Sequence, residues 1–315
     1  MKKLVKKPLL LLAIGFIIGY ITSVIADTIN SNEVLYDNSI VNSNVDNVQD
    51  ALNDMYRIYN RSGLGFSLLT HNPVGLSNEL IGGLYRYQGA TADNYICFGT
   101  LNKDTCTGDT DKYMYRIIGI NTSGQMKLIK KEALNTTYYW NSSGSVAWPY
   151  SELFIGLNGS YFLDNSTYIP DESWKNRIAT FIWKYGNTNN KGLSAAEMYN
   201  VEMGFNDTVS AKIGLMYLHD YDYAMVGGKN CASVADRDAC KLSWIFLDKN
   251  DATHPGSNET VMTNGTNSYY KWYILSNGML DLQYHDSAVR PVFYLNSNQS
   301  IASGSGTLSD PYILN

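Results

Sequence analysis

The chain has 315 residues, 44% of them hydrophobic, and a formal net charge of −5 at pH 7. This length and composition suffice for a sizeable hydrophobic core in one large or two modest domains. The first 26 residues contain four lysines and no acidic residue, so the rest of the chain is more acidic still. A negatively charged surface repels phosphate backbones, which excludes nucleic acid as an expected partner.

An apolar run over 8–26 follows the four lysines and ends before Asp27. A basic start, an apolar stretch and small residues before a polar turn are typical of a secretory signal. The run is also close to the length that spans a bilayer. Residues 1–26 are therefore either a cleaved signal peptide or a retained N-terminal membrane anchor. Both alternatives predict an extracellular protein, secreted or held at the cell surface.

Four cysteines form two pairs of equal spacing, Cys97 with Cys106 and Cys231 with Cys240. In an exported protein this spacing predicts two local disulfides that close short, polar loops. The alternative is a zinc site, but structural zinc sites favour a tighter spacing of the ligands within a pair. We therefore expect two disulfides, and neither a metal ion nor another cofactor.

Residues 27–62 are expected to form a spacer that contains one helix. Its apolar residues recur at intervals of three and four over 44–60, which predicts a short amphipathic helix. The apolar stripe must pack against the main domain or against a second copy of itself. An oligomer formed through 44–60 is therefore one alternative. Residues 63–80 contain His71-Asn72-Pro73 and no long period, so they are expected to be a linker.

The main domain is expected over 81–315, with antiparallel strands on either side of a helical middle. The predicted strands are 84–87, 94–98, 113–120, 125–130, 213–218, 242–247, 271–275, 279–284 and 289–295. The predicted helices are 151–157, a helix from 171 that carries an apolar face as far as Ile182, and a helix that follows the capping box Ser194-x-x-Glu197. Strands, then helices, then strands predict a single α+β domain.

Five short segments, in this order along the chain, carry a resemblance to known proteins: 94–99, 115–120, 127–130, 213–217 and 289–296. With them, 81–315 resembles a family of exported proteins from low-GC Gram-positive bacteria that share a C-terminal domain of unknown function. More distantly, this domain resembles the C-type-lectin-like and formylglycine-enzyme-like group. That resemblance implies a compact mixed domain with a ligand face made of long loops. The chain lacks the sequence triplets of the calcium-dependent sugar site, so the resemblance does not imply calcium-mediated sugar binding.

The loops at 229–241 and 248–270 are the expected ligand face, because binding residues concentrate on long loops of a rigid scaffold. Aromatic rings stack on sugars, and carboxylate and amide groups can bind polar ligands. The predicted ligand-binding residues are Trp244, Asp248, Asn250, Asp251, Tyr270 and Trp272. The expected function is a binding or adhesion module for an extracellular glycan or protein.

The sequence gives little sign of an enzyme, because it has no nucleophile elbow, no zinc-protease helix and no phosphate loop. The alternative is a cell-envelope hydrolase or transpeptidase. It requires His219 and Asp220 to meet His285 and Asp286 in one cleft. A third hypothesis is a structural component of a stalked surface assembly. Arg290 is expected to be a buried structural residue paired with a carboxylate.

Overall fold

The computed structural model describes residues 64–315, except 143–146, 250–257 and 267–269. The expectations for 1–26 and for the helix at 44–60 lie outside these residues and stay predictions. Among the described helices, none combines the length and the hydropathy needed to cross a bilayer. The described part is a mixed α+β structure built on antiparallel sheets, as predicted.

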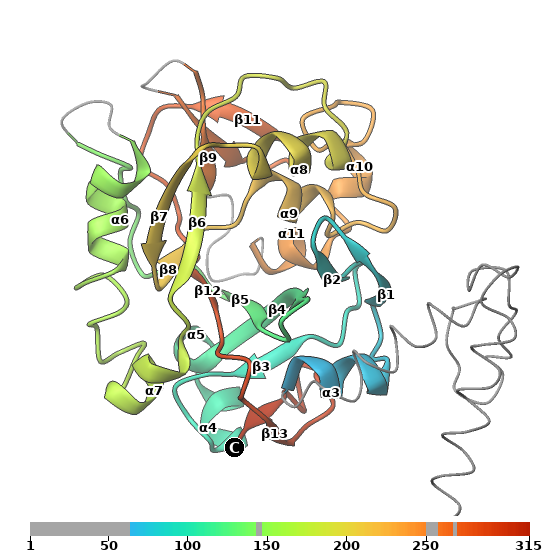
Figure 1. Cartoon of the computed structure of the whole chain (residues 1–315), viewed down its shortest axis with the longest axis vertical. Helices are drawn as coiled ribbons and strands as arrows, with labels where there is room; N and C mark the ends of the chain where they lie inside the picture. Colours follow the sequence, from blue (N-terminus) through green and yellow to red (C-terminus); the bar gives the residue numbers. More distant parts are fainter. Residues whose placement is uncertain (1–63, 143–146, 250–257, 267–269) are drawn as a thin grey trace, which may run out of the picture. The chain divides into compact units, whose positions relative to one another are not determined.

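Within the described residues, a seven-stranded antiparallel sheet forms the centre of the domain (Figure 1). The strand order is β1-β2-β4-β5-β12-β8, and β3 pairs with β4 outside this path. The strands are β1 (Leu76–Ile81), β2 (Leu84–Tyr87), β3 (Tyr95–Cys97), β4 (Met114–Asn121), β5 (Met126–Lys130), β8 (Ile213–Gly214) and β12 (Val292–Tyr294). Every residue of β5 is buried, so both faces of the sheet are covered at its centre.

The described residues also form three smaller sheets. The three-stranded sheet has the order β11-β10-β9, and the two others are the ribbons β6-β7 and β13-β14. Their strands are β6 (Phe181–Tyr185), β7 (Asp207–Ala211), β9 (Glu259–Asn264), β10 (Lys271–Ile274), β11 (Leu280–Gln283), β13 (Ile301–Ser303) and β14 (Ile313–Leu314). The predicted hairpins β4-β5 and β10-β11 are confirmed.

The helices are short and lie around the sheets. They are α3 (Leu64–His71), α4 (Lys103–Gly108), α5 (Thr110–Tyr113), the 3-10 helix η2 (Trp148–Tyr150), α6 (Glu152–Leu157), α7 (Glu172–Arg177), α8 (Ala195–Met203), α9 (Leu218–Asp222), α10 (Arg237–Cys240) and α11 (Trp244–Lys249). The predicted capping box is present at the start of α8, where Ser194 and Glu197 bond each other's backbone amides. Ser151 likewise caps α6.

Three sequence-based assignments are wrong over part of their length. The strand predicted at 213–218 is limited to Ile213–Gly214, and Leu218 begins the helix α9. The helix predicted from 171 ends at Arg177, and Phe181 instead begins β6, where its ring stacks on Tyr294 at 3.9 Å. The strand predicted at 242–247 is mostly the helix α11. Short apolar runs fit either structure, and here burial of Trp244 and Ile245 hides the helical period. Tertiary packing decided these cases.

The segment expected to be a linker, 63–80, contains regular structure. The helix α3 precedes β1, and β1 pairs with β2 through Leu76 and Tyr87. Leu76 and Leu68 are both buried. The compact unit therefore begins before residue 81.

Both predicted disulfides are confirmed, with S–S lengths of 2.04 Å for Cys97–Cys106 and 2.03 Å for Cys231–Cys240. The first ties β3 to α4, and the second closes the loop that leads through α10. All four sulfur-bearing residues are fully buried. Each bridge therefore fixes a surface loop to the core.

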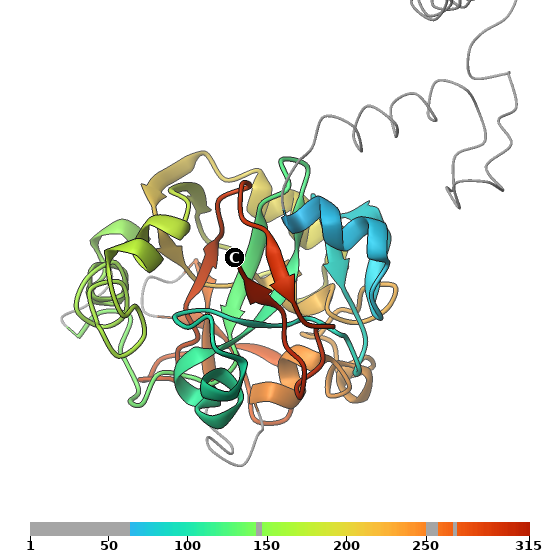
Figure 2. The same ribbon diagram turned by 90° about the horizontal axis from the view of Figure 1, so that it is seen from below.

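The helix α3 and the C-terminus lie at one end of the domain, and β11 and α10 lie at the other (Figures 1 and 2). The loop 304–312, between β13 and β14, approaches the segment before β3 at the first end. Gly306 has φ +83°, and a Cβ atom there would lie 2.4 Å from the carbonyl oxygen of Asp93. Only glycine fits this position without a shift of the backbone.

Candidate functional site

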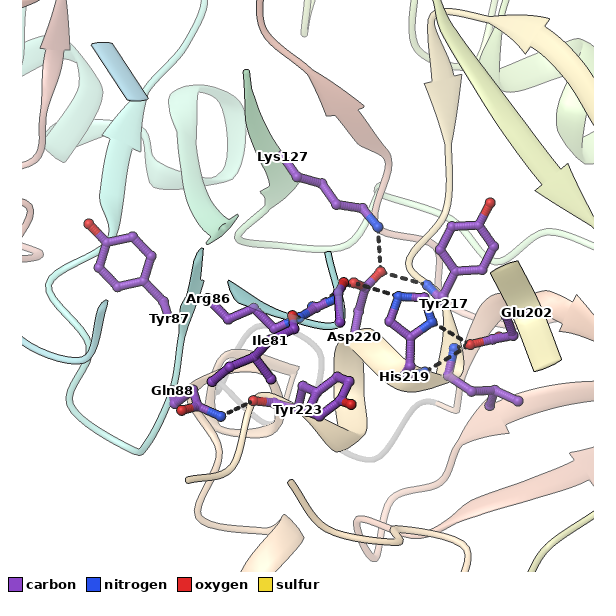
Figure 3. A network of polar contacts seen from close by, with 12 residues as sticks. Ile81, Arg86, Tyr87, Gln88, Lys127, Glu202, Tyr217, His219, Asp220 and Tyr223 are labelled. Carbon is purple, nitrogen blue, oxygen red and sulfur yellow. Dashed lines mark hydrogen bonds and ion pairs between the residues drawn. The ribbon is translucent and has the colours of Figure 1, made fainter. Parts of the chain in front are cut away.

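Asp220, near the start of α9, lies at the centre of a buried network of charges (Figure 3). Its Oδ1 accepts a hydrogen bond from Nη1 of Arg86 at 2.8 Å, and its Oδ2 accepts one from Nζ of Lys127 at 2.5 Å. The backbone amide of Tyr217 donates to the same Oδ2 at 2.9 Å. The three charged side chains are at most 2% exposed.

A second buried carboxylate, Glu202 of α8, continues the network. It accepts bonds from the backbone amides of Leu218 and His219 at 3.0 and 3.1 Å, and from the hydroxyl of Thr263. The His219 ring bonds Glu202 through Nδ1 at 2.6 Å, and its Nε2 lies 3.6 Å from Oδ1 of Asp220. The ring therefore joins the two carboxylates.

Burial and the neighbouring charges both shift the pKa values of the network. Burial lowers the pKa of the Lys127 ammonium, although Asp220 opposes this effect. Burial also lowers the pKa of His219, which favours the neutral ring. For Asp220 burial alone would raise the pKa, but the cations Lys127 and Arg86 hold it below its usual range. Asp220 is therefore ionised and balances the positive charges of Arg86 and Lys127.

The network contains residue types that catalytic sites use, but a substrate cannot reach them. Its lysine, histidine and two carboxylates are each bonded to protein groups and are almost completely buried. A catalytic acid or base must come within hydrogen-bond reach of a substrate. A closed arrangement of this kind instead positions α9 against β5 and the β1-β2 hairpin.

The pair His285 and Asp286 belongs to a different cluster. The His285 ring lies on Tyr273 at 4.6 Å, and its Nε2 is 3.1 Å from the amide nitrogen of Asn258. Asp286 accepts a bond from the hydroxyl of Thr137. No contact joins this cluster to His219 or Asp220 among the described residues. The described contacts therefore do not join the four residues of the enzyme alternative into one cluster.

Two of the predicted ligand residues lie in a buried ion-pair site. Asp248 accepts two hydrogen bonds from Nη1 of Arg116, at 2.8 and 2.9 Å. The guanidinium of Arg116 lies 4.8 Å from the ring of Trp244, whose Nε1 donates to the carbonyl of Tyr87. Asp248 and Trp244 are buried, at 7% and 1% exposure. They stabilise the core between β4 and α11 and do not offer a surface to a ligand.

Arg290 is likewise a buried structural residue, as predicted. Its Nε and Nη2 donate to the two carboxylate oxygens of Glu259, both at 2.9 Å. Its side chain is 1% exposed. This pair connects the start of β9 to the segment before β12.

Of the other predicted ligand residues, Trp272 is fully buried and donates from Nε1 to the carbonyl of Thr188 at 2.7 Å. Its ring therefore anchors β10 to the loop after β6. Asn250 and Asp251 lie outside the described residues. Tyr270 is 44% exposed, directly before β10. It is the predicted ligand residue that the structure leaves at the surface.

Tyr270 has a partner that the sequence search did not single out. In the β10-β11 hairpin Lys271 lies opposite Gln283, and extending this register by one residue sets Tyr270 opposite Tyr284. Directly opposed residues project from the same side of a sheet, about 5 Å apart at Cβ. Tyr284 is 52% exposed. Both tyrosines are therefore exposed next to the open end of the hairpin.

An amide-rich loop lies beside these rings. The amide of Thr188 donates to the carbonyl of Asn264 at 2.9 Å, and the amide of Gly265 donates to the carbonyl of Tyr270 at 2.9 Å. Three exposed asparagines on this loop, with the two tyrosines, define the hairpin-end face: Asn187, Asn189, Asn190, Tyr270 and Tyr284. Rings and amides of this kind can hold a polar ligand by stacking and hydrogen bonding.

Of the two loops expected to form the ligand face, 229–241 lies close to this hairpin, whereas 248–270 is not one loop, because its described part includes the strand β9. The amide of Leu280 donates to the carbonyl of Cys231 at 2.8 Å. The side-chain amide of Asn230 donates to the carbonyl of Lys191 at 3.0 Å. The disulfide loop 229–241 therefore supports both the hairpin and the amide-rich loop. The turn Ser276-Asn277-Gly278 was the available signal for Tyr284, because it fixes the register.

Comparisons of the chain with protein-family models, with curated proteins and with solved structures found no match. The candidate site therefore rests on the geometry of this chain alone.

Proposed function

We propose that this protein is an extracellular binding module that holds a glycan or protein ligand on the hairpin-end face. The observation that carries the proposal is the exposed pair Tyr270 and Tyr284 beside an amide-rich loop. Exposed aromatic residues on rigid loops are a common basis of recognition. Hydrogen bonds to β9 and β10 hold the loop, so the face is ordered before a ligand arrives.

The position of the face supports this proposal. The described chain enters at α3, at the end of the domain that also carries the C-terminus, and β11 lies at the opposite end (Figure 1). A segment that precedes α3 therefore attaches far from the face. This separation leaves the face clear of the point where the chain enters the domain, which suits a protein secreted or held at the cell surface by residues 1–26.

The chemistry of the interior also favours binding over catalysis. The acid, base and amine groups around Asp220 are closed off from solvent and satisfied by protein partners. Two disulfides suit an extracellular location. The resemblance to exported proteins of Gram-positive bacteria, and to the C-type-lectin-like group, is part of the proposal.

The test compares the full-length chain in mild detergent with two variants on a panel of extracellular glycans and proteins. The first variant carries Tyr270→Ala and Tyr284→Ala. The second, Tyr150→Ala, removes a tyrosine that is 72% exposed on η2, outside the face. We expect at least one ligand that the wild type and Tyr150→Ala retain and the double variant loses. Equal retention by all three, or no retained ligand on the panel, contradicts the proposal.

A further inference from the structure

We infer that the ligand of the hairpin-end face is an uncharged oligosaccharide. This inference rests on the proposed function and specifies the class of ligand. It follows from the charges around the face, from the direction of the side chains and from the groups that the face presents.

Two opposite charges next to the face compensate each other. Lys191, which follows the exposed asparagines, pairs with Asp281 of β11. The face residues themselves are tyrosines and asparagines, which are uncharged at neutral pH. An anionic or cationic ligand would lose hydration here without meeting an opposite charge, which makes its binding unfavourable.

Lys271 does not supply such a charge, although it follows Tyr270 directly. Successive residues of a strand point to opposite sides of the sheet, so Lys271 and Tyr270 diverge. The Lys271 residue is 4% exposed, and its Nζ lies 4.9 Å from the centre of the Trp140 ring. Burial lowers its pKa to about 8. Its ammonium is therefore directed into the protein, away from the rings of the face.

The groups that remain match a pyranose ring. The C–H side of a sugar packs on an aromatic ring, and its hydroxyl or N-acetyl groups bond to amides. The two tyrosines provide exposed aromatic rings. The exposed Asn187 and the Nδ2 of Asn190, on the neighbouring loop, offer donors and acceptors. A flat protein surface needs a larger apolar area than two half-exposed phenols offer.

The test uses three tetrasaccharides in calorimetric titrations of the full-length chain: the neutral tetramers of glucose and of N-acetylglucosamine, and the acidic hyaluronan tetrasaccharide. We expect at least one neutral tetramer to bind, at least about tenfold more tightly than the acidic one. Raising sodium chloride from 0.05 to 0.5 M should leave that affinity unchanged, because no ion pair is formed. A chelator should have no effect.

Variants separate this inference from the proposed function. Tyr270→Ala or Tyr284→Ala should weaken binding of the neutral tetramer about tenfold, whereas Tyr270→Phe keeps the ring and most of the affinity. Preferred binding of hyaluronan or of a protein, lost in the alanine variants, overturns the uncharged-sugar inference and leaves the proposed function standing. Sugar binding that is unchanged in both alanine variants overturns the inference and the proposed function. No binding of either neutral tetramer overturns the inference.

Discussion

The buried network around Asp220 and the hairpin-end face differ in what their polar groups bond to. Around Asp220, charged groups from β2, β5, α8 and α9 satisfy one another and exclude solvent. At the hairpin-end face, uncharged rings and amides stand on a rigid support and remain exposed. The buried acidic and basic residues stabilise the fold, whereas the uncharged tyrosines and asparagines lie at the surface.

This difference follows from the cost of burial. A buried charge must be paired and fully hydrogen-bonded, so evolution of a binding site from the Asp220 network would first require opening it. The hairpin-end face carries no such cost, because its residues are uncharged and exposed to solvent. Variants of the two regions should therefore separate stability from binding.

The largest expected effect comes from Asp220→Ala. The change leaves Arg86 and Lys127 buried without their carboxylate and removes the cap on the Tyr217 amide. We expect a loss of about 3–5 kcal/mol in the free energy of unfolding, measured with urea. The matched control is Asp164→Ala, which breaks the exposed pair with Lys175 and should cost about 0.5 kcal/mol or less. Equal losses would show that the Asp220 network is not structural.

The two disulfides sharpen the comparison, because they close loops of equal length in different places. Serine at both Cys231 and Cys240, or at both Cys97 and Cys106, should cost about 2–4 kcal/mol in each case. Only the first pair supports the β10-β11 hairpin, through the bond from Leu280 to Cys231. At a temperature where both variants remain folded, the first should bind ligand more weakly than the second. The opposite order would contradict the position of the site.

Asp222 provides a test through pH. Burial raises the pKa of this carboxyl well above its usual value, and nearby Glu202 and Asp236 act in the same direction. A raised carboxyl pKa makes wild-type stability fall as pH rises above about 4, the unfolded value. Asp222→Asn should therefore stabilise the protein at pH 7, because it removes the cost of keeping this carboxyl buried.

At pH 3.5 this variant should have nearly the same free energy of unfolding as the wild type, because the carboxyl is mostly protonated in both the folded and the unfolded state. Asparagine can still accept the bond from the Cys231 amide. A destabilisation at both pH values would show that Asp222 is held as an anion. The measurement is urea unfolding of the wild type and the variant at the two pH values.

The smallest effect on stability is expected at the face itself. Tyr270→Ala and Tyr284→Ala should each change the free energy of unfolding by about 0.5 kcal/mol or less, because both side chains are about half exposed. Thermal unfolding of the two variants and of Tyr150→Ala checks this. A large loss would mean that the rings pack as part of the core and are not available to a ligand.

Local signals predicted much of the fold. The capping box at Ser194, the turns of the two hairpins and the cysteine spacing each depend on residues close in the sequence, and each is confirmed. The assignment at 242–247 is wrong because burial on most sides of α11 erased the helical period. Local pattern cannot report what a distant segment covers.

The candidate site was less predictable for the same reason. Whether Trp244 and Trp272 face solvent depends on contacts with Tyr87 and Thr188, far away in the sequence. The burial of Asp248 depends on Arg116 in the same way. Tyr284 could have been found, because the turn at Asn277-Gly278 sets it opposite Tyr270. Recognition of the amide-rich loop required the fold.

The most direct measurement is hydrogen–deuterium exchange of the full-length chain with and without the neutral tetrasaccharide that binds best. Peptides that cover 186–192 and 270–284 should exchange more slowly when the sugar is bound. A peptide that covers 217–222 should be unchanged, because α9 lies in the closed network. Protection at 217–222 without protection at the hairpin end would contradict the assignment of the binding site.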